Sequence, residues 1–263
     1  MVSDIYLSCQ KTKTKSPSLG DFHMHTHDFY EIYCFFSGNA KYYVEGNIYN
    51  LKHGDILFIK KAEAHTLQLM SDATYERAVI NFNFQAPINE KSQTALLEFD
   101  KIPLGKGNRF SFSRFNDKHW LYYIDKIISC DNEDDRRLYL SVLISEMYEC
   151  RGEALALPAE QDAFADIITY LNSNITNDMT LESICENFFI SKSQLNRKFR
   201  RMIGSTVWEY ITSKRLILAK DLLNHGETPT TVSTKCGFND YTSFYRAYKA
   251  KFSVSPKMDY VKV

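Results

Sequence analysis

The chain has 263 residues, of which 44% are hydrophobic and 24% charged, a composition typical of a globular protein with room for two domains. No apolar run approaches the ~20 residues that a membrane-spanning helix needs, and the start of the chain lacks the apolar core of a secretory signal. Six scattered cysteines without C-x-x-C spacing predict reduced thiols and no zinc site, and therefore a cytoplasmic protein.

The net charge is zero, but the charges are unevenly distributed along the chain. Residues 1–158 hold 18 Lys/Arg and 21 Asp/Glu, whereas residues 159–263 hold 14 and 11, which gives −3 and +3. Within the second part, the stretch 192–201 contains five cations and no acid. Because phosphate binding depends on locally concentrated cations, this cluster indicates either a nucleic-acid contact or an ordinary solvated helix face.

Aromatic and β-branched residues dominate the stretch 21–84. The runs with the composition of strands are 30–36, 40–46, 55–61, 65–70 and 77–84. Turn-forming residues separate them at 37–39, 45–47, 53–55 and 71–72. Many short strands in succession predict an antiparallel barrel or sandwich. Residues 86–115 have a mixed pattern that predicts no particular element.

From residue 117 the apolar residues take the spacing of a helix. One helix is predicted around Trp120–Ile128, and a second around Leu140–Met147 after the acidic break DNEDD. These helices can pack on the barrel or on a second subunit. The stretch 151–160, with a Gly and a Pro and little pattern, is typical of a linker.

Residues 160–263 are predicted to be all helix, with seven helices in total. An apolar stripe begins at Phe164, and Thr180 can cap a short helix. Ser191 and Gln194 form the capping pattern S-x-x-Q of the next helix, which Gly204 ends. Later helices are expected at 206–223, near 230–236 and from Asp240 to about Lys251.

This region contains one arrangement twice: a short helix, a tight turn, and a longer basic helix. The two copies are residues 181–204 and 230–252. A helix–turn–helix needs a small residue where its helices cross, and Cys185 and Ser233 occupy the matching positions. It also needs apolar residues four apart on the inner face of the second helix; these are Leu195 with Phe199, and Phe244 with Tyr248.

The outer faces of the two longer helices are expected to contact double-stranded DNA. Arg can read guanine and Asn adenine in the major groove, whereas other cations suit phosphates. On the first helix the predicted DNA-binding residues are Lys192, Ser193, Gln194, Asn196, Arg197, Arg200 and Arg201. On the second helix they are Tyr241, Thr242, Tyr245, Arg246 and Lys249. Taken singly each can be ordinary surface, but the duplication favours two recognition helices in successive major-groove turns, ~34 Å apart.

The second copy, CGFNDYTSFYRAYKAKFSVSP, resembles the signature of the AraC/XylS family of bacterial transcription regulators. The matching positions are Gly237, Phe238, Phe244, Arg246, Lys249, Phe252 and Pro256. The first copy, ISKSQLNRKFRRMIGST, also matches, and the resemblance covers about residues 160–257. Ser253 and Tyr248 stand where the family usually has Gly and Phe, and the tail KMDYVKV lacks a tyrosine–arginine pair. The resemblance implies a seven-helix domain that binds promoter DNA, with RNA polymerase as a further partner.

The stretch HTHDFYE, residues 25–31, resembles the start of the first cupin pattern. The residues that fit are His25, His27, Glu31 and Gly38, followed by Gly54 and His65 from the second pattern. Lys60 and Ala62 depart from the usual Pro and Gly. The resemblance covers about residues 20–85 and implies a cupin-like barrel, which many regulators of this family use as a sensor.

Two interpretations of these polar residues remain open. Strand alternation puts His25, His27 and Glu31 on one face, where with His65 they can ligate Fe, Mn, Zn or Ni. We favour the alternative, in which they bind a small-molecule effector or each other at the barrel mouth. Tyr33 shares this face and is added to the predicted ligand-binding residues, although it can equally be core. We expect no catalytic residue and no resident cofactor.

The sequence therefore predicts an α+β protein of two domains: a cupin-like β-barrel followed by helices, and an all-α domain with two helix–turn–helix units. The predicted parts are the barrel 1–115, a helical dimerisation segment and linker 116–158, and the DNA-binding domain 159–263. We expect a cytoplasmic homodimeric transcription regulator whose barrel senses a small molecule. The alternatives are a metal-dependent cupin enzyme fused to a DNA-binding domain, and a constitutive regulator without a ligand.

Overall fold

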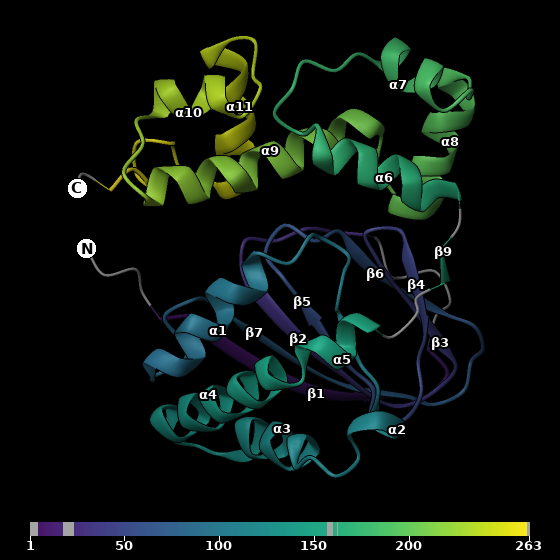
Figure 1. Cartoon of the computed structure of the whole chain (residues 1–263), viewed down its shortest axis with the longest axis vertical. Helices are drawn as coiled ribbons and strands as arrows, with labels where there is room; N and C mark the ends of the chain where they lie inside the picture. Colours follow the sequence, from purple (N-terminus) through teal and green to yellow (C-terminus); the bar gives the residue numbers. More distant parts are fainter. Residues whose placement is uncertain (1–4, 18–23, 157–159, 162, 262–263) are drawn as a thin grey trace. The chain divides into compact units, whose positions relative to one another are not determined.

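The computed structural model describes residues 5–17, 24–156, 160–161 and 163–261. The chain divides into two compact units, which are described one at a time. The first consists mainly of residues 29–162 with the N-terminal strand, and the second of residues 163–263 together with the segment His23–Asp28 (Figure 1). No helix among the described residues is long and apolar enough to cross a membrane.

The first unit is built on two antiparallel sheets. The larger sheet contains, in spatial order, β1 (Leu7–Thr14), β7 (Tyr75–Phe82), β2 (Tyr30–Ser37), β5 (Ile56–Ile59) and β8 (Arg109–Phe110). The smaller sheet contains β6 (His65–Leu69), β3 (Ala40–Val44), β4 (Asn47–Asn50) and β9 (Glu160–Gln161). The β-rich N-terminal domain is confirmed. The closed barrel is not, because the described strands pair within each sheet only and two-residue strands end both sheets on one side.

Strand β2 shows how both faces of the larger sheet are used. Tyr30, Ile32 and Cys34 belong to a buried cluster shared with the helices. Tyr33 and Phe35 belong to the cluster between the two sheets. All five are at most 2% exposed. Since successive side chains of a strand point to opposite faces, the apolar run is a strand buried on both faces.

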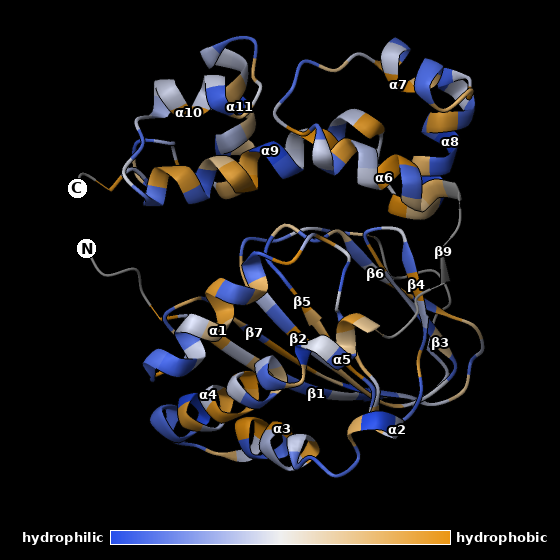
Figure 2. Ribbon diagram, viewed as in Figure 1, coloured by the Kyte–Doolittle hydropathy of each residue, from blue (hydrophilic) through white to orange (hydrophobic). Residues whose placement is uncertain are grey.

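Helices cover the other face of the larger sheet. They are α1 (Glu90–Asp100), α2 (Phe112–Phe115), α3 (Trp120–Ser129), α4 (Glu133–Glu149) and α5 (Arg151–Ala156). Trp120 of α3 and Ile144 of α4 lie in one cluster with Tyr30 and Phe58 of the sheet. Hydrophobic and hydrophilic residues mix on both helices (Figure 2), so each has a side for the core and a side for solvent. The predicted linker 151–160 is wrong in part, because α5 and the start of β9 occupy it.

The second unit consists of helices. They are α6 (Ala163–Ser173), α7 (Leu181–Asn187), α8 (Lys192–Ile203), α9 (Val207–Asn224), α10 (Pro229–Lys235) and α11 (Tyr241–Phe252). Residues 163–261 therefore form six helices, and the predicted number of seven is wrong. After α11 the Met258 amide donates to Ser255 O at 2.9 Å, which makes a turn instead of a helix. The Val261 amide then donates to Leu223 O at 3.2 Å, so the tail returns to the end of α9.

Candidate DNA-binding surface and sensor site

The first helix–turn–helix consists of α7, the turn 188–191 and α8. Capping boxes start both helices. In α8, the Ser191 hydroxyl accepts from the Gln194 amide at 3.3 Å, and Gln194 Oε1 accepts from the Ser191 amide at 3.0 Å. Gly204 ends α8 with φ 73°, and its amide donates to Arg200 O at 3.0 Å. Both ends of α8 are therefore set by local sequence, as the pattern predicted.

The inner face of α8 holds the helix in place. Leu195, Phe199 and Ile203 are at most 4% exposed. The Phe199 ring lies 4.9 Å from that of Phe164 on α6 and 5.7 Å from that of Tyr210 on α9, measured between centroids. Because these apolar contacts fix one side of α8, its opposite, basic side faces solvent.

The second helix–turn–helix consists of α10 and α11. Asp240 caps α11 by accepting from the Ser243 amide at 2.8 Å, and hydrogen bonds from the Ser243 hydroxyl and amide lower the pKa of the Asp240 carboxyl. Phe244 and Tyr248 are fully buried on the inner face. The Tyr248 hydroxyl donates to Asp259 Oδ2 at 2.6 Å. The departure from the usual Phe thus has a structural consequence, because the added hydroxyl binds the C-terminal tail.

Arg215 on α9 links the two helix–turn–helix units. Its Nε donates to Ile175 O at 2.7 Å and its Nη2 to Asn177 O at 2.8 Å, both in the loop before α7. Its Nη1 donates to Gly237 O at 2.5 Å, in the turn between α10 and α11. Partial burial lowers the pKa of this guanidinium, and the three carbonyls compensate for the lost water. Sequence reasoning missed Arg215, since backbone carbonyl partners leave no residue pattern.

The predicted DNA-binding residues lie on the outer faces of α8 and α11. Eleven of the twelve are exposed, and Asn196 is half-buried. Three have polar side-chain partners within the chain, since Lys192 pairs with Glu182, Gln194 caps α8 and the Ser193 hydroxyl lies 3.1 Å from that of Ser191. Within the described residues, no acidic side chain forms an ion pair with the four arginines, which are Arg197, Arg200, Arg201 and Arg246. Their guanidinium groups are therefore available to phosphates or base edges.

A polar cluster lies between the sheets of the first unit. The Tyr42 hydroxyl donates to Glu31 Oε1 at 3.1 Å, and His65 Nε2 lies 3.8 Å from Glu31 Oε2. His65 Nδ1 lies 2.8 Å from Glu63 O, and since a carbonyl only accepts, Nδ1 carries the proton. The other ring nitrogen, Nε2, lies on the Glu31 side. Glu31 is 6% exposed and His65 fully buried.

The neighbouring tyrosines extend this cluster into the core. The hydroxyls of Tyr33 and Tyr75 lie 2.7 Å apart, and the Tyr33 and Tyr42 rings lie 4.6 Å apart. Burial raises the pKa of the Tyr33 and Tyr42 phenols well above their ordinary value, so both stay neutral. The sequence left open whether Tyr33 binds a ligand or belongs to the core, and the structure places it in the core between the sheets.

The two histidines of the opening motif are placed differently from the expectation. Strand β2 begins at Tyr30, so His25 and His27 precede it and strand alternation does not align them with Glu31. The expected common strand face is therefore wrong for the histidines. Their rings lie 5.9 Å apart, in a segment that groups with the second unit.

Comparison with known proteins matches both halves of the chain. A model of the AraC-like ligand binding domain matches residues 18–87, and a model of a helix-turn-helix domain matches residues 184–258. Together these matches span more than half of the chain.

Relatives of known function resemble the chain over nearly its full length. The HTH-type transcriptional activator RhaS of Escherichia fergusonii is 23% identical, over 90% of this chain and 87% of that protein. RhaS of Yersinia pestis is 24% identical, over 90% and 88%. Among solved structures, ToxT from Vibrio cholerae bound to an unsaturated fatty acid is 18% identical, with a TM-score of 0.41, over 96% of this chain and 94% of that one. With a ligand-binding domain at one end and a helix-turn-helix domain at the other, the chain belongs to the AraC family of DNA-binding transcription regulators.

Proposed function

We propose that this chain regulates transcription by binding double-stranded promoter DNA through α8 and α11, under the control of an effector bound by the β-rich domain. The observation that carries the proposal is the duplicated helix–turn–helix, in which each second helix buries an apolar face and exposes a polar or basic one. The family matches over both halves support the same proposal.

The polar and charged residues on the outer sides of α8 and α11 divide into two roles. Arg197 and Arg246 suit base reading, because each lies on an outer face with a guanidinium that can make two parallel hydrogen bonds to guanine. Lys198, Arg201 and Lys249 suit phosphates, which position the helices without reading sequence. Asn196 is half-buried, which makes it a weaker candidate for base contact than the arginines.

The test uses DNA selected from a random pool by the full chain. Arg246→Ala is expected to weaken binding by about 1–3 kcal/mol and to relax the base preference at one position. Lys198→Ala is expected to weaken binding evenly across sequences and to lower the slope of log K against log salt by about 0.9. Lys91→Ala, which removes an exposed cation of α1, is the control. If the two variants of the helix–turn–helix units bind like wild type, the proposed surface is wrong.

The proposed effector site is the polar cluster of Glu31, Tyr42 and His65. A carboxylate, a phenol and an imidazole that are surrounded by aromatic rings suit a small polar molecule. Calorimetric titration of the full chain with a panel of polar metabolites would identify it. Glu31→Gln should lose that heat signal while keeping the fold. A true effector must also shift DNA affinity, because coupling between two sites is reciprocal.

A metal ion is the specific alternative at this site. Glu31 and His65 offer such an ion a carboxylate oxygen and an imidazole nitrogen, and His25 and His27 would complete the donor set that the sequence predicts. His65 fits the role, since a ligating histidine commonly donates its other ring N–H to a carbonyl, as Nδ1 does to Glu63 O. A bound divalent ion would supply a coordination position for an anionic effector. Metal analysis of purified protein decides: stoichiometric metal that is lost in His65→Ala supports this alternative over a metal-free site.

We also propose a homodimer formed through the helical segment 116–158. Tyr122 of α3 is 52% exposed and Leu138 of α4 is 46% exposed. The Tyr122 ring lies 6.3 Å from that of Tyr139 on α4, so the two helices meet beside these exposed apolar side chains. Sedimentation of wild type and of a Tyr122→Ser, Leu138→Ser double variant tests it: wild type should sediment as a dimer and the variant as a monomer.

Action at the promoter would require RNA polymerase in the cytoplasm. The relatives of known function are transcriptional activators, so we propose that this chain activates. Transcription with purified polymerase from a template that carries a selected site should rise when the full chain is added. A fall would identify a repressor.

A further inference from the structure

The turns of the two helix–turn–helix units have one backbone geometry. In the first, the Ile190 amide donates to Cys185 O at 3.1 Å; in the second, the Phe238 amide donates to Ser233 O at 3.1 Å. The residue before each of these amides takes a left-handed conformation, φ 49° at Phe189 and φ 78° at Gly237. Such hydrogen bonding ends a helix with a left-handed residue that is usually glycine, because a side chain there is strained.

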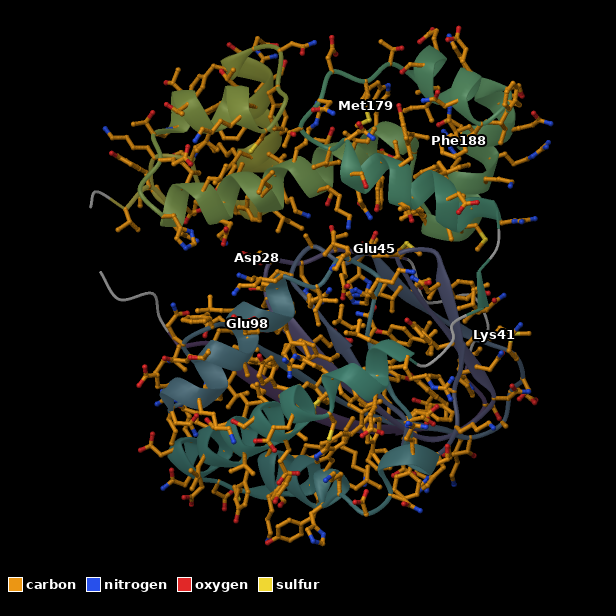
Figure 3. All side chains as sticks on the ribbon, viewed as in Figure 1. Asp28, Lys41, Glu45, Glu98, Met179 and Phe188 are labelled. Carbon is orange, nitrogen blue, oxygen red and sulfur yellow. The ribbon has the colours of Figure 1, made fainter. Side chains whose placement is uncertain are left out.

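Phe189 therefore adopts a conformation that suits glycine better, and its ring gains nothing inside the chain. The ring is 98% exposed, more than any other large hydrophobic side chain among the described residues. Its neighbours supply the packing of the turn. Phe188, labelled in Figure 3, contacts Tyr170 of α6 with ring centroids 5.4 Å apart, and Ile190 is half-buried. A strained and exposed aromatic side chain indicates a contact outside the chain.

The position of Phe189 points to the identity of that contact. It lies two residues before Ser191, which caps the recognition helix α8. The exposed side chains that follow are Lys192 and Ser193, and further along the helix are the arginines of its outer face. A ring at the edge of such a basic surface fits an anionic partner with apolar faces. The sugars and thymine methyl groups of DNA offer these between phosphates.

We propose that Phe189 is an apolar DNA contact beside the groove that α8 reads. This inference rests on the proposed DNA-binding function, and it adds a residue that a search for basic side chains does not identify. The second helix–turn–helix, α10 with α11, lacks such a group, because Gly237 occupies the equivalent position. The contact is therefore specific to the half-site bound by the first unit.

The experiment compares Phe189→Gly and Phe189→Tyr in the full chain, on DNA selected by wild type. Phe189→Gly is expected to bind about tenfold more weakly, and Phe189→Tyr to retain most of the affinity. An apolar contact releases no counterions, so the salt slope should stay unchanged, unlike that of Lys198→Ala. The thermal midpoint of Phe189→Gly should not fall, since the ring is exposed and glycine relieves the left-handed strain. A lower midpoint would assign the ring to the fold and overturn the proposal.

Two further arms separate the remaining outcomes. In the first arm, uracil replaces thymine in the DNA and so removes the methyl groups. If this replacement weakens DNA binding by wild type but not by Phe189→Gly, the ring contacts a thymine methyl group. If it affects both proteins alike, the ring contacts the sugars. Unchanged DNA affinity of Phe189→Gly, with Arg197→Ala still impaired, overturns this inference and leaves the proposed function intact. If transcription with polymerase then fails, the ring contacts the polymerase and not DNA. If Arg197→Ala also binds normally, the proposed function itself fails.

Discussion

The two helix–turn–helix units share a backbone but differ in what occupies its special positions. In the first, the left-handed turn residue is Phe189 and the left-handed residue that ends the long helix is Gly204. In the second the order is reversed, with Gly237 in the turn and Ser253 at the helix end. Each unit therefore contains one strained residue and one glycine. The difference shows that the fold tolerates a side chain at either position wherever space is open.

Space decides where the glycine is required. A Cβ at Gly237 would lie 2.8 Å from Thr176 O and 2.9 Å from Arg215 Cζ. Phe189 has open solvent around it. Gly237 of the second helix–turn–helix is thus packed against α9 and the loop before α7, whereas Phe189 of the first projects outward. Both long helices bury their inner faces, so the two units differ in the left-handed turn residue, which is enclosed at Gly237 and open at Phe189.

Among the changes that test this difference between the two turns, Gly237→Ala should lower stability most. The new methyl group would collide with Thr176 O and the Arg215 guanidinium while the backbone stays left-handed, which should destabilise the unit by about 3 kcal/mol. Denaturant unfolding followed by circular dichroism measures it. The matched control is Phe189→Ala, where the strain is kept and an exposed ring is lost, with an expected change below about 0.5 kcal/mol. Equal effects at both positions would contradict the comparison.

Arg215→Ala should come next, at about 2 kcal/mol, because three carbonyls lose a charged donor. Its more specific consequence concerns DNA. With the link between the two units removed, affinity for a site with both half-sites should fall far more than affinity for a single half-site. Arg201→Ala, an exposed arginine of α8, should leave stability unchanged and weaken both probes alike. If Arg215→Ala weakens both probes equally, Arg215 does not orient the units.

The helices of the C-terminal unit, residues 163–263, were predictable because their signals are local. Ser191 with Gln194, and Gly204, fix the ends of α8 within a few residues, and apolar pairs four apart mark the buried faces. Contacts between distant residues left no comparable signal. Strand β1 was missed because apolar residues occur only at Leu7 and Cys9 of an edge strand that is otherwise polar. An edge strand has one neighbour and needs less apolar surface.

The sensor site was predictable only in its residue types. The sequence singled out Glu31 and His65, and the structure adds that β2 and β6 carry them in different sheets whose facing sides form one core. Periodicity alone does not show which strands face each other. The role of Tyr42 was missed for the same reason, since its hydroxyl reaches Glu31 across the two sheets. Whether His25 and His27 join these residues stays a prediction.

The smallest expected effect concerns the helix ends. Ser253 takes φ 62° and its amide donates to Lys249 O at 2.9 Å, so α11 ends as α8 does at Gly204 but with a strained side chain. Ser253→Gly should therefore stabilise the protein by about 0.5–1 kcal/mol, and Gly204→Ser should destabilise it by a similar amount. Both changes are measured by thermal unfolding of the full chain. Since both residues are C-caps and lie beyond the helical turns that carry the proposed DNA contacts, DNA affinity below the melting transition should remain at the wild-type value. A change in affinity without a change in stability would mean that the helix ends also position the DNA contacts.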